Sequence, residues 1–160
     1  MFAPLRRHAL RLAASILLAL PVAAAAGELR VTVEGIRSTH GMVLIGLYDG
    51  ARTFLRAVEA ADKPGFLIDP ERFGAVALRA NKARRSGVVF THLQPGRYAV
   101  VVLHDENGNG HLDKNLLGFP TEPYGFSNGA EGFLGPPSFA DAAMTLGPGD
   151  SEIRIELILP

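Results

Sequence analysis

The amino-acid sequence predicts an all-β fold: a sandwich of two antiparallel sheets with about seven strands, preceded by a signal peptide. Three observations support this prediction. No long helical period of apolar residues occurs in the chain. Short apolar runs instead alternate with clusters of Gly, Pro, Asn and Asp. Short strands separated by frequent turns are typical of two sheets that pack face to face.

The first half of the mature chain contains two strands. Residues 28–34 alternate between apolar and polar side chains, which predicts a strand with one face in the core. Residues 41–48 are apolar almost throughout, which indicates a more buried strand, and residues 35–41 between them resemble a hairpin connection. Residues 51–58 are expected to form one or two helical turns, and residues 59–72 an irregular loop.

The second half contains the other strands, which are predicted at residues 74–80, 87–93, 97–102 and 152–159. Pro95-Gly96 suits a tight turn, because Pro sets φ and Gly tolerates positive φ. The strand after this turn is apolar on both faces, as expected for a central strand. The stretch L-x-P-G-x-Y-x-V at 93–100 resembles the turn-and-strand signature of transthyretin-like and immunoglobulin-like domains.

The N-terminal residues 1–26 have the three parts of a secretory signal. Three arginines form a basic region, residues 12–20 form an apolar stretch, and Ala24-Ala25-Ala26 supplies small residues for cleavage. The apolar stretch is short for a membrane span, which favours a cleaved signal over the alternative, a single membrane anchor. We therefore expect the mature chain, residues 27–160, to form one domain that is periplasmic or secreted.

The charge and cysteine content of the mature chain exclude several classes of function. Without the leader it has 13 basic and 16 acidic residues, a net charge of −3. This balance argues against nucleic acid as a partner, because binding phosphates requires a basic surface. The chain has no cysteine and therefore no disulfide, and no membrane span is expected in the mature part.

Residues 104–141 are predicted to form a long ordered loop at one end of the sandwich. Residues 115–140 are rich in Gly and Pro and show little periodicity, which in a compact domain indicates a functional or a disordered segment. The aromatic residues in it argue against disorder, because they can bury apolar area. They are Phe119, Tyr124, Phe126, Phe133 and Phe139.

The stretch HDENGNGHLD, residues 104–113, is similar to the first nine positions of an EF-hand calcium loop. Such a loop supplies oxygen ligands at alternate positions and bends sharply at a Gly in the sixth. The positions are filled by Asp105 (first), Asn107 (third), Asn109 (fifth), Gly110 (sixth), His111 (seventh, through its carbonyl) and Asp113 (ninth).

This loop departs from the EF-hand pattern in two ways. The twelfth position is Leu116, so the closing Glu is missing, and a strand precedes the loop where an EF-hand has a helix. A remote carboxylate must then complete the ligand set: Glu122 or Asp141, with Glu106 as a further choice. We predict a weak Ca²⁺ site with a Kd of about 10⁻⁴–10⁻³ M.

Other interpretations of the loop remain open. Asn-Gly sequences form tight turns without any ion, because both residues tolerate positive φ. Another ion is the third choice. Zinc is disfavoured because oxygen donors dominate here, and only His104 and His111 offer nitrogen.

Three motifs in series carry a family resemblance: HDENGNGHLD at 104–113, GFPTEPYGFSNGA at 118–130 and GPPSFADAA at 135–143. Together they resemble the bacterial exported family catalogued as domain of unknown function 2141, over residues 28–159. The resemblance implies a small exported β-sandwich with no established enzymatic activity. The matching positions are His104, Asp105, Asn107, Asn109, Asp113, Gly118, Pro120, Glu122, Gly125, Phe126, Ser127, Asn128, Pro136, Pro137, Phe139 and Asp141.

Two functions of different classes follow. The favoured one is a non-catalytic exported module whose loop region 104–141 is organised by calcium and binds an unknown protein or glycan in the cell envelope. The alternative is an envelope hydrolase in which His104 acts with Asp105, Glu122 or Asp141. The chain has neither Cys nor a G-x-S-x-G motif, so no nucleophile is evident. His104 is more simply interpreted as a half-buried side chain that hydrogen-bonds a loop carbonyl.

Overall fold

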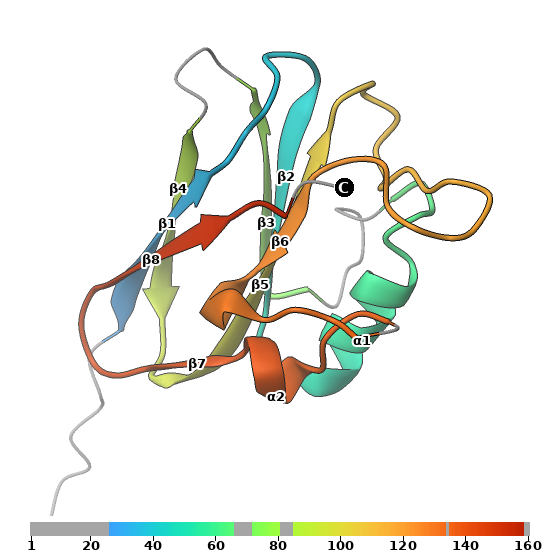
Figure 1. The fold of residues 1–160 in the computed structure, drawn as a ribbon. Helices are drawn as coiled ribbons and strands as arrows, with labels where there is room; N and C mark the ends of the chain where they lie inside the picture. Colours follow the sequence, from blue (N-terminus) through green and yellow to red (C-terminus); the bar gives the residue numbers. More distant parts are fainter. Residues whose placement is uncertain (1–25, 66–71, 81–84, 134, 159–160) are drawn as a thin grey trace, which may run out of the picture.

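The computed structural model describes residues 26–65, 72–80, 85–133 and 135–158, and these form two packed sheets with helices on one side (Figure 1). The predicted all-β sandwich is confirmed, with eight strands among the described residues. The predicted signal peptide lies outside the described residues except for Ala26, and so does most of the basic turn at 82–85.

The strands divide between a smaller and a larger sheet. The smaller sheet has the order β4 (Ser86–Leu93), β1 (Gly27–Glu34), β8 (Ser151–Glu156). The larger sheet has the order β3 (Gly74–Arg79), β2 (Met42–Tyr48), β5 (Gly96–Asp105), β6 (Tyr124–Phe126). Strand β7 (Met144–Leu146) pairs with the first residues of β5. The helices are α1 (Ala51–Glu59), the short 3₁₀ helix η1 (Ser127–Gly129) and α2 (Phe139–Ala142).

The connection between β1 and β2 is not the hairpin that the sequence suggested. β1 pairs with β4 and, in parallel, with β8, whereas β2 pairs with β3 and β5. Residues 35–41 therefore cross from one sheet to the other. Gly41 has φ 68°, and a Cβ on it would collide with the carbonyl oxygen of Asp105. The alternation of side chains determines which face of a strand is buried, but it does not determine which strand pairs with it.

The inner faces of the two sheets form the first core. The alternation predicted for β1 is confirmed, since Leu29, Val31 and Val33 have no exposed surface. They pack against the inward side chains of β2 and β5, among them Ile45 and Val102.

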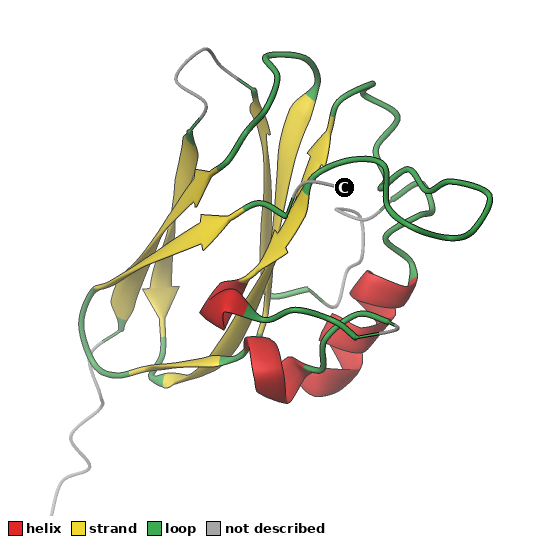
Figure 2. Ribbon diagram, viewed as in Figure 1, coloured by secondary structure: helices red, strands yellow, loops and turns green. Residues whose placement is uncertain are grey.

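Helices and loops cover the outer face of the larger sheet (Figure 2), and a second core of buried side chains lies beneath them. Val101 and Leu103 of β5 point to this side, opposite Val100 and Val102. They are covered by α1 and by the segment 112–142. The predicted long loop therefore contains β6, η1 and α2, and lies over a sheet face rather than at one end of the sandwich. This cover explains why β5 is apolar on both faces.

Hydrogen bonds of Ser127 and Asn128 hold the covering segment together and join it to the sheet. Ser127 is fully buried; its hydroxyl donates to the carbonyl of Ala142 (2.6 Å) and accepts the N–H of Val100 (2.8 Å). The amide of Asn128 donates to the carbonyl of Asp141 (2.8 Å). None of the helices in the described part of the chain has the length and apolar character needed to cross a bilayer.

Candidate functional site

The loop that follows β5 winds around one buried carboxylate. Asp105, at the end of β5, is 2% exposed. Its Oδ1 accepts the backbone N–H groups of Gly108 (2.8 Å) and Asn109 (3.1 Å), and its Oδ2 accepts that of Gly110 (2.8 Å). Gly108 and Gly110 have φ values of 78° and 83°, which Gly adopts without strain. We call residues 105–113 the β5 loop. Asp105 organises it through backbone donors alone.

Three side chains of the β5 loop converge on one point near its surface. The amide nitrogen of Asn107 lies 2.6 Å from Oδ2 of Asp113, and that of Asn109 lies 3.0 Å from Oδ1. The amide oxygens of the two asparagines accept the backbone N–H groups of Asn109 (3.0 Å) and His111 (3.1 Å). The ring of His111 also faces Asp113, with Nε2 3.4 Å from Oδ1. The structure therefore brings together the third, fifth and ninth positions of the predicted calcium loop.

Glu122 reaches the β5 loop in a role that the sequence did not reveal. Its carboxylate is 5% exposed and accepts the backbone N–H groups of Glu106 (2.8 Å, Oε1) and Asp113 (3.0 Å, Oε2). One carboxylate thus holds both ends of the loop. Glu122 therefore supports the loop by fixing both of its ends.

Asp141 lies far from the β5 loop and cannot complete its ligand set. It caps α2, where its Oδ2 accepts the hydroxyl (2.6 Å) and the N–H (3.1 Å) of Ser138. The hydroxyl of Ser138 lowers the pKa of this carboxyl below its ordinary value. Helix α2 contacts the start of β5, where Arg97 donates to the carbonyl of Ala140 (3.4 Å). Asp105 follows Arg97 by eight strand residues, roughly 26 Å. Figure 1 shows α2 and the end of β5 on opposite sides of the domain.

The described residues contain no group of three or more His, Asp or Glu side chains placed to hold a metal ion. The β5 loop forms no such group, because some of the ligands that the sequence predicted there are Asn amides and not carboxylates. Asp105 and Glu122 are engaged by backbone donors. Asp113 is the most exposed of the loop carboxylates, with 34% of its side chain accessible against 22% for Glu106, which is paired with Arg37.

His104 is buried in the sheet rather than presented to solvent. Its ring has no exposed surface, and Nε2 lies 3.1 Å from the carbonyl oxygen of His40. A carbonyl only accepts, so Nε2 carries the proton. Nδ1 has no hydrogen-bond partner within the described structure, and Oε1 of Glu106 lies 4.0 Å away. The predicted bond to a loop carbonyl is present, and the side chain is more deeply buried than expected. A substrate cannot reach this ring, so the hydrolase alternative gains no support.

An ion pair fastens the crossing segment 35–41 to the β5 loop. Arg37 donates from Nη2 to Oε2 of Glu106 (2.6 Å), and from Nε to both carboxylate oxygens at 3.0–3.1 Å. Nη2 also donates to the carbonyl of Thr121 (3.0 Å). The hydrogen bonds from Arg37 hold the pKa of Glu106 below its ordinary value, and the same contact raises the pKa of Arg37.

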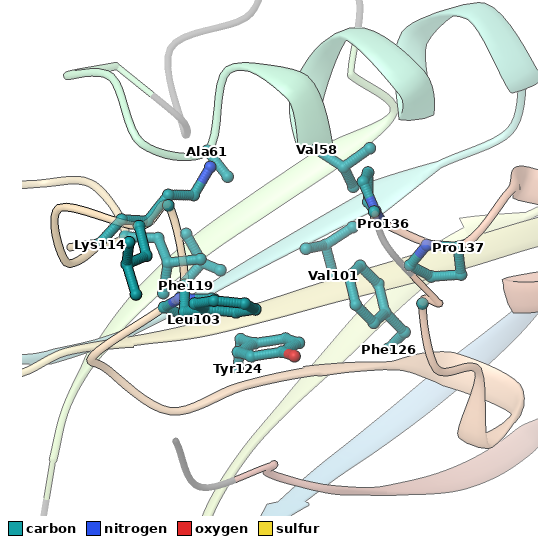
Figure 3. Close-up of a pocket in the computed structure, with 16 residues that line it drawn as sticks. Val58, Ala61, Val101, Leu103, Lys114, Phe119, Tyr124, Phe126, Pro136 and Pro137 are labelled. Carbon is teal, nitrogen blue, oxygen red and sulfur yellow. The ribbon is translucent and has the colours of Figure 1, made fainter.

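A cavity of about 420 Å³ lies next to the β5 loop, between α1 and the outer face of β5 and β6 (Figure 3). Val101 and Leu103 lie along its middle, with Lys114 toward one end and Pro137 toward the other. Its described lining is Val58, Ala61, Val101, Leu103, Leu112, Lys114, Leu117, Gly118, Phe119, Pro120, Tyr124, Phe126, Gly132, Gly135, Pro136 and Pro137. The sequence did not predict this cavity. The signal that could have indicated it is the density of Gly, Pro and aromatic residues at 115–140.

Lys114 is the charged residue in this lining. Its Nζ donates to Oδ2 of Asp62 at 3.0 Å, and this bond lowers the pKa of Asp62. Leu112 joins the cavity to the β5 loop, because it belongs to both and its N–H donates to the carbonyl of Ala61 (2.7 Å).

The chain matches the model of one known protein family over most of its length. Residues 31–154 match the model of a family described as uncharacterized proteins conserved in bacteria (DUF2141). The chain belongs to this family. The match confirms the resemblance carried by the three motifs, and both the β5 loop and the cavity of this DUF2141 protein lie inside the matched region. No curated protein and no solved structure matches the chain.

Removing the Arg37 guanidinium of this DUF2141 protein should cost stability at neutral pH and progressively less in acid. The ion pair lowers the pKa of Glu106, so its contribution is fully present above the unfolded pKa of about 4.3 and is lost as the pH falls through the lower folded pKa. Arg37→Met should reduce the free energy of unfolding by about 0.5–1 kcal/mol at pH 7, a value discounted for partial exposure.

Urea denaturation at neutral pH and at pH values descending through the acid range measures this difference. Arg30→Met, an exposed change on β1, is the control. Its difference from the parent in free energy of unfolding should not become smaller as the pH falls. A gap between Arg37→Met and the parent that stays constant into strong acid would contradict the assignment.

Proposed function

We propose that this DUF2141 protein is an exported, non-catalytic binding module that holds its ligand in the cavity beside α1. The observation that carries the proposal is the cavity itself, because its volume of about 420 Å³ falls within the range of roughly 300–1,000 Å³ typical of small-ligand sites. Its described lining contains no Ser, Thr, Cys, His, Asp or Glu, so it offers no hydroxyl–imidazole or thiol–imidazole pair and no carboxylate for acid–base chemistry. The apolar walls favour an apolar ligand group over a glycan.

Dye binding tests the cavity. Anilinonaphthalene sulfonate fluoresces strongly in apolar surroundings and should bind the folded protein at one site. A Cβ added at Gly135 meets no atom within 4 Å, so Gly135→Trp can be accommodated at the cavity wall and should weaken dye binding about tenfold or more.

Gly147→Trp is the matched control, since Gly147 has equal space and lies outside the cavity lining. It should leave dye binding unchanged. Circular dichroism checks that both variants are folded. The proposal fails if the folded parent protein binds no dye, or if both variants bind it as the parent does.

Export of the protein is supported by the basic, apolar and small-residue pattern of residues 1–26. In a bacterial host the mature protein should appear in the periplasmic fraction or the medium, shortened at its N-terminus by about 26 residues. Deleting residues 2–20 should leave the protein in the cytoplasm. Mass spectrometry of the fractionated protein measures both results. Recovery of the uncleaved chain from the cytoplasm would contradict export.

We further propose that the β5 loop binds Ca²⁺ weakly and so steadies the wall of the cavity. What favours this is the convergence of Asn107 and Asn109 on the exposed carboxylate of Asp113. With an ion at this point, a half-turn of each amide would direct two oxygens toward it; ligation would then replace the hydrogen bonds that these oxygens accept from the N–H groups of Asn109 and His111. Asp105 and Glu122 then hold the loop backbone around the ion. Leu112 carries the effect into the cavity lining.

Calorimetric titration of the chelated protein with CaCl₂ tests this second proposal. The expected Kd is about 10⁻⁴–10⁻³ M, because few carboxylates are available. Asp113→Asn should abolish binding. Asp150→Asn, whose carboxylate accepts the N–H of Glu28 far from the loop in the sequence, should bind as the parent does. The absence both of heat and of a rise in Tm at millimolar calcium would overturn the proposal.

A further inference from the structure

The described lining of the cavity has few polar side chains, and its one charged side chain lies toward one end. Among the side chains in its described lining, Lys114 and Tyr124 carry polar groups, and the others are aliphatic, aromatic, Pro or Gly. Figure 3 shows Lys114 toward one end and Pro136 and Pro137 toward the other. A sugar is usually held by several polar side chains, and the described lining has two. A ligand that matches it has a long apolar body and one charged or polar end.

Lys114 can accept an anionic group without giving up its present partner. An ammonium group has three N–H donors, and the bond to Oδ2 of Asp62 uses one of them. The Lys114 side chain is 31% exposed, so the remaining donors are within reach of a second acceptor. The end of the cavity near Lys114 is therefore suited to a carboxylate head group.

The rim of the cavity exposes large apolar side chains. Leu117 is 81% and Phe119 63% exposed, and both also line the cavity. Leu116 beside them is fully exposed, and Phe133, which lies between η1 and α2, is 92% exposed. Neighbouring exposed apolar side chains of this size are typical of binding surfaces.

The exposure of these leucines is set by an ordered turn. The side-chain oxygen of Asn115 accepts the N–H groups of Leu117 (2.9 Å) and Phe119 (3.1 Å). The N–H of Asn115 donates to the carbonyl of Phe119 (2.8 Å), and its carbonyl accepts the N–H of Gly118 (2.9 Å). Asn115 therefore holds the loop so that Leu117 lines the cavity.

We infer that the cavity binds a single-chain anionic amphiphile, a free fatty carboxylate, with its head at Lys114 and its tail along Val101 and Leu103 toward Pro137. This inference rests on the proposed binding function and names its ligand class. Leu117 and Phe119 contact the bound chain and lose exposed apolar area when it enters, so binding is driven by apolar burial and oriented by one charge.

Calorimetry with saturated carboxylates, each below its critical micelle concentration, tests the inference. Each added methylene should tighten binding about fourfold until the cavity is full, after which the gain ends. A fatty alcohol of the same length should bind several-fold more weakly than the carboxylate. Lys114→Met should remove this difference and keep the dependence on chain length.

The neighbouring leucines supply a matched pair of variants. Leu117→Ser removes a cavity wall and should weaken binding on the order of tenfold. Leu116→Ser makes the same change at a side chain outside the lining, and should leave binding unchanged. Both residues are exposed, so neither change disturbs the core. Thermal melting of each variant checks that its Tm equals that of the parent.

Four results would overturn the inference. The first is failure of every carboxylate to bind while the dye still binds, which leaves the cavity function intact and rejects this ligand class. The second is equal loss of binding in both leucine variants, which assigns the effect to the loop surface. The third is binding to vesicles of phosphatidylglycerol and phosphatidylethanolamine without binding of free carboxylates. The fourth is a concentration-dependent dimer that Leu116→Ser abolishes, which makes a second copy the occupant.

Discussion

The architecture depends on one constraint: strand β5 is apolar on both faces and must be buried on both. Val100 and Val102 point into the space between the sheets, and Val101 and Leu103 point to the opposite side. A two-sheet sandwich buries only the first pair, so the second requires another layer. Helix α1 and the segment 112–142 supply that layer; the buried Ser127 hydroxyl accepts the N–H of Val100 in β5 and donates to Ala142 within the layer. The protein is thus a sandwich with one covered outer face.

The cavity lies where this covering layer stands away from the sheet, over Val101 and Leu103. The same chain segment forms the β5 loop, contributes Leu112 and Lys114 to the lining, and then turns at Asn115 to present its leucines. An ion held by the loop and a ligand held by the cavity would therefore act on one continuous stretch of backbone. This continuity is why the two proposals are tested with separate probes, calcium for the loop and dye or carboxylates for the cavity.

The carboxylates around the β5 loop show how buried acidic side chains can shape a loop. Burying a carboxylate is costly unless its oxygens accept hydrogen bonds. Asp105 and Glu122 meet this requirement with five backbone N–H groups between them, and these hydrogen bonds shape the loop. Asp113 remains nearer the surface, between the two Asn amides. The spacing of ligands was readable from the sequence, whereas which carboxylates were already occupied depended on backbone donors that only the folded loop brings near.

The sequence by itself determined what depends on local pattern: the β-sandwich class, the buried face of β1, the central character of β5, the tight turns and the family. Only the tertiary structure decided which strands pair, because side-chain alternation is the same for any partner. It therefore corrected the supposed hairpin between β1 and β2 and revealed the parallel pairing of β1 with β8. Tertiary structure also separated Asp141 from the loop and created the cavity, since both depend on how residues distant in sequence pack over β5. The stretch HDENGNGHLD specified a turn built on Asp105, and the fold placed that turn at the edge of a pocket.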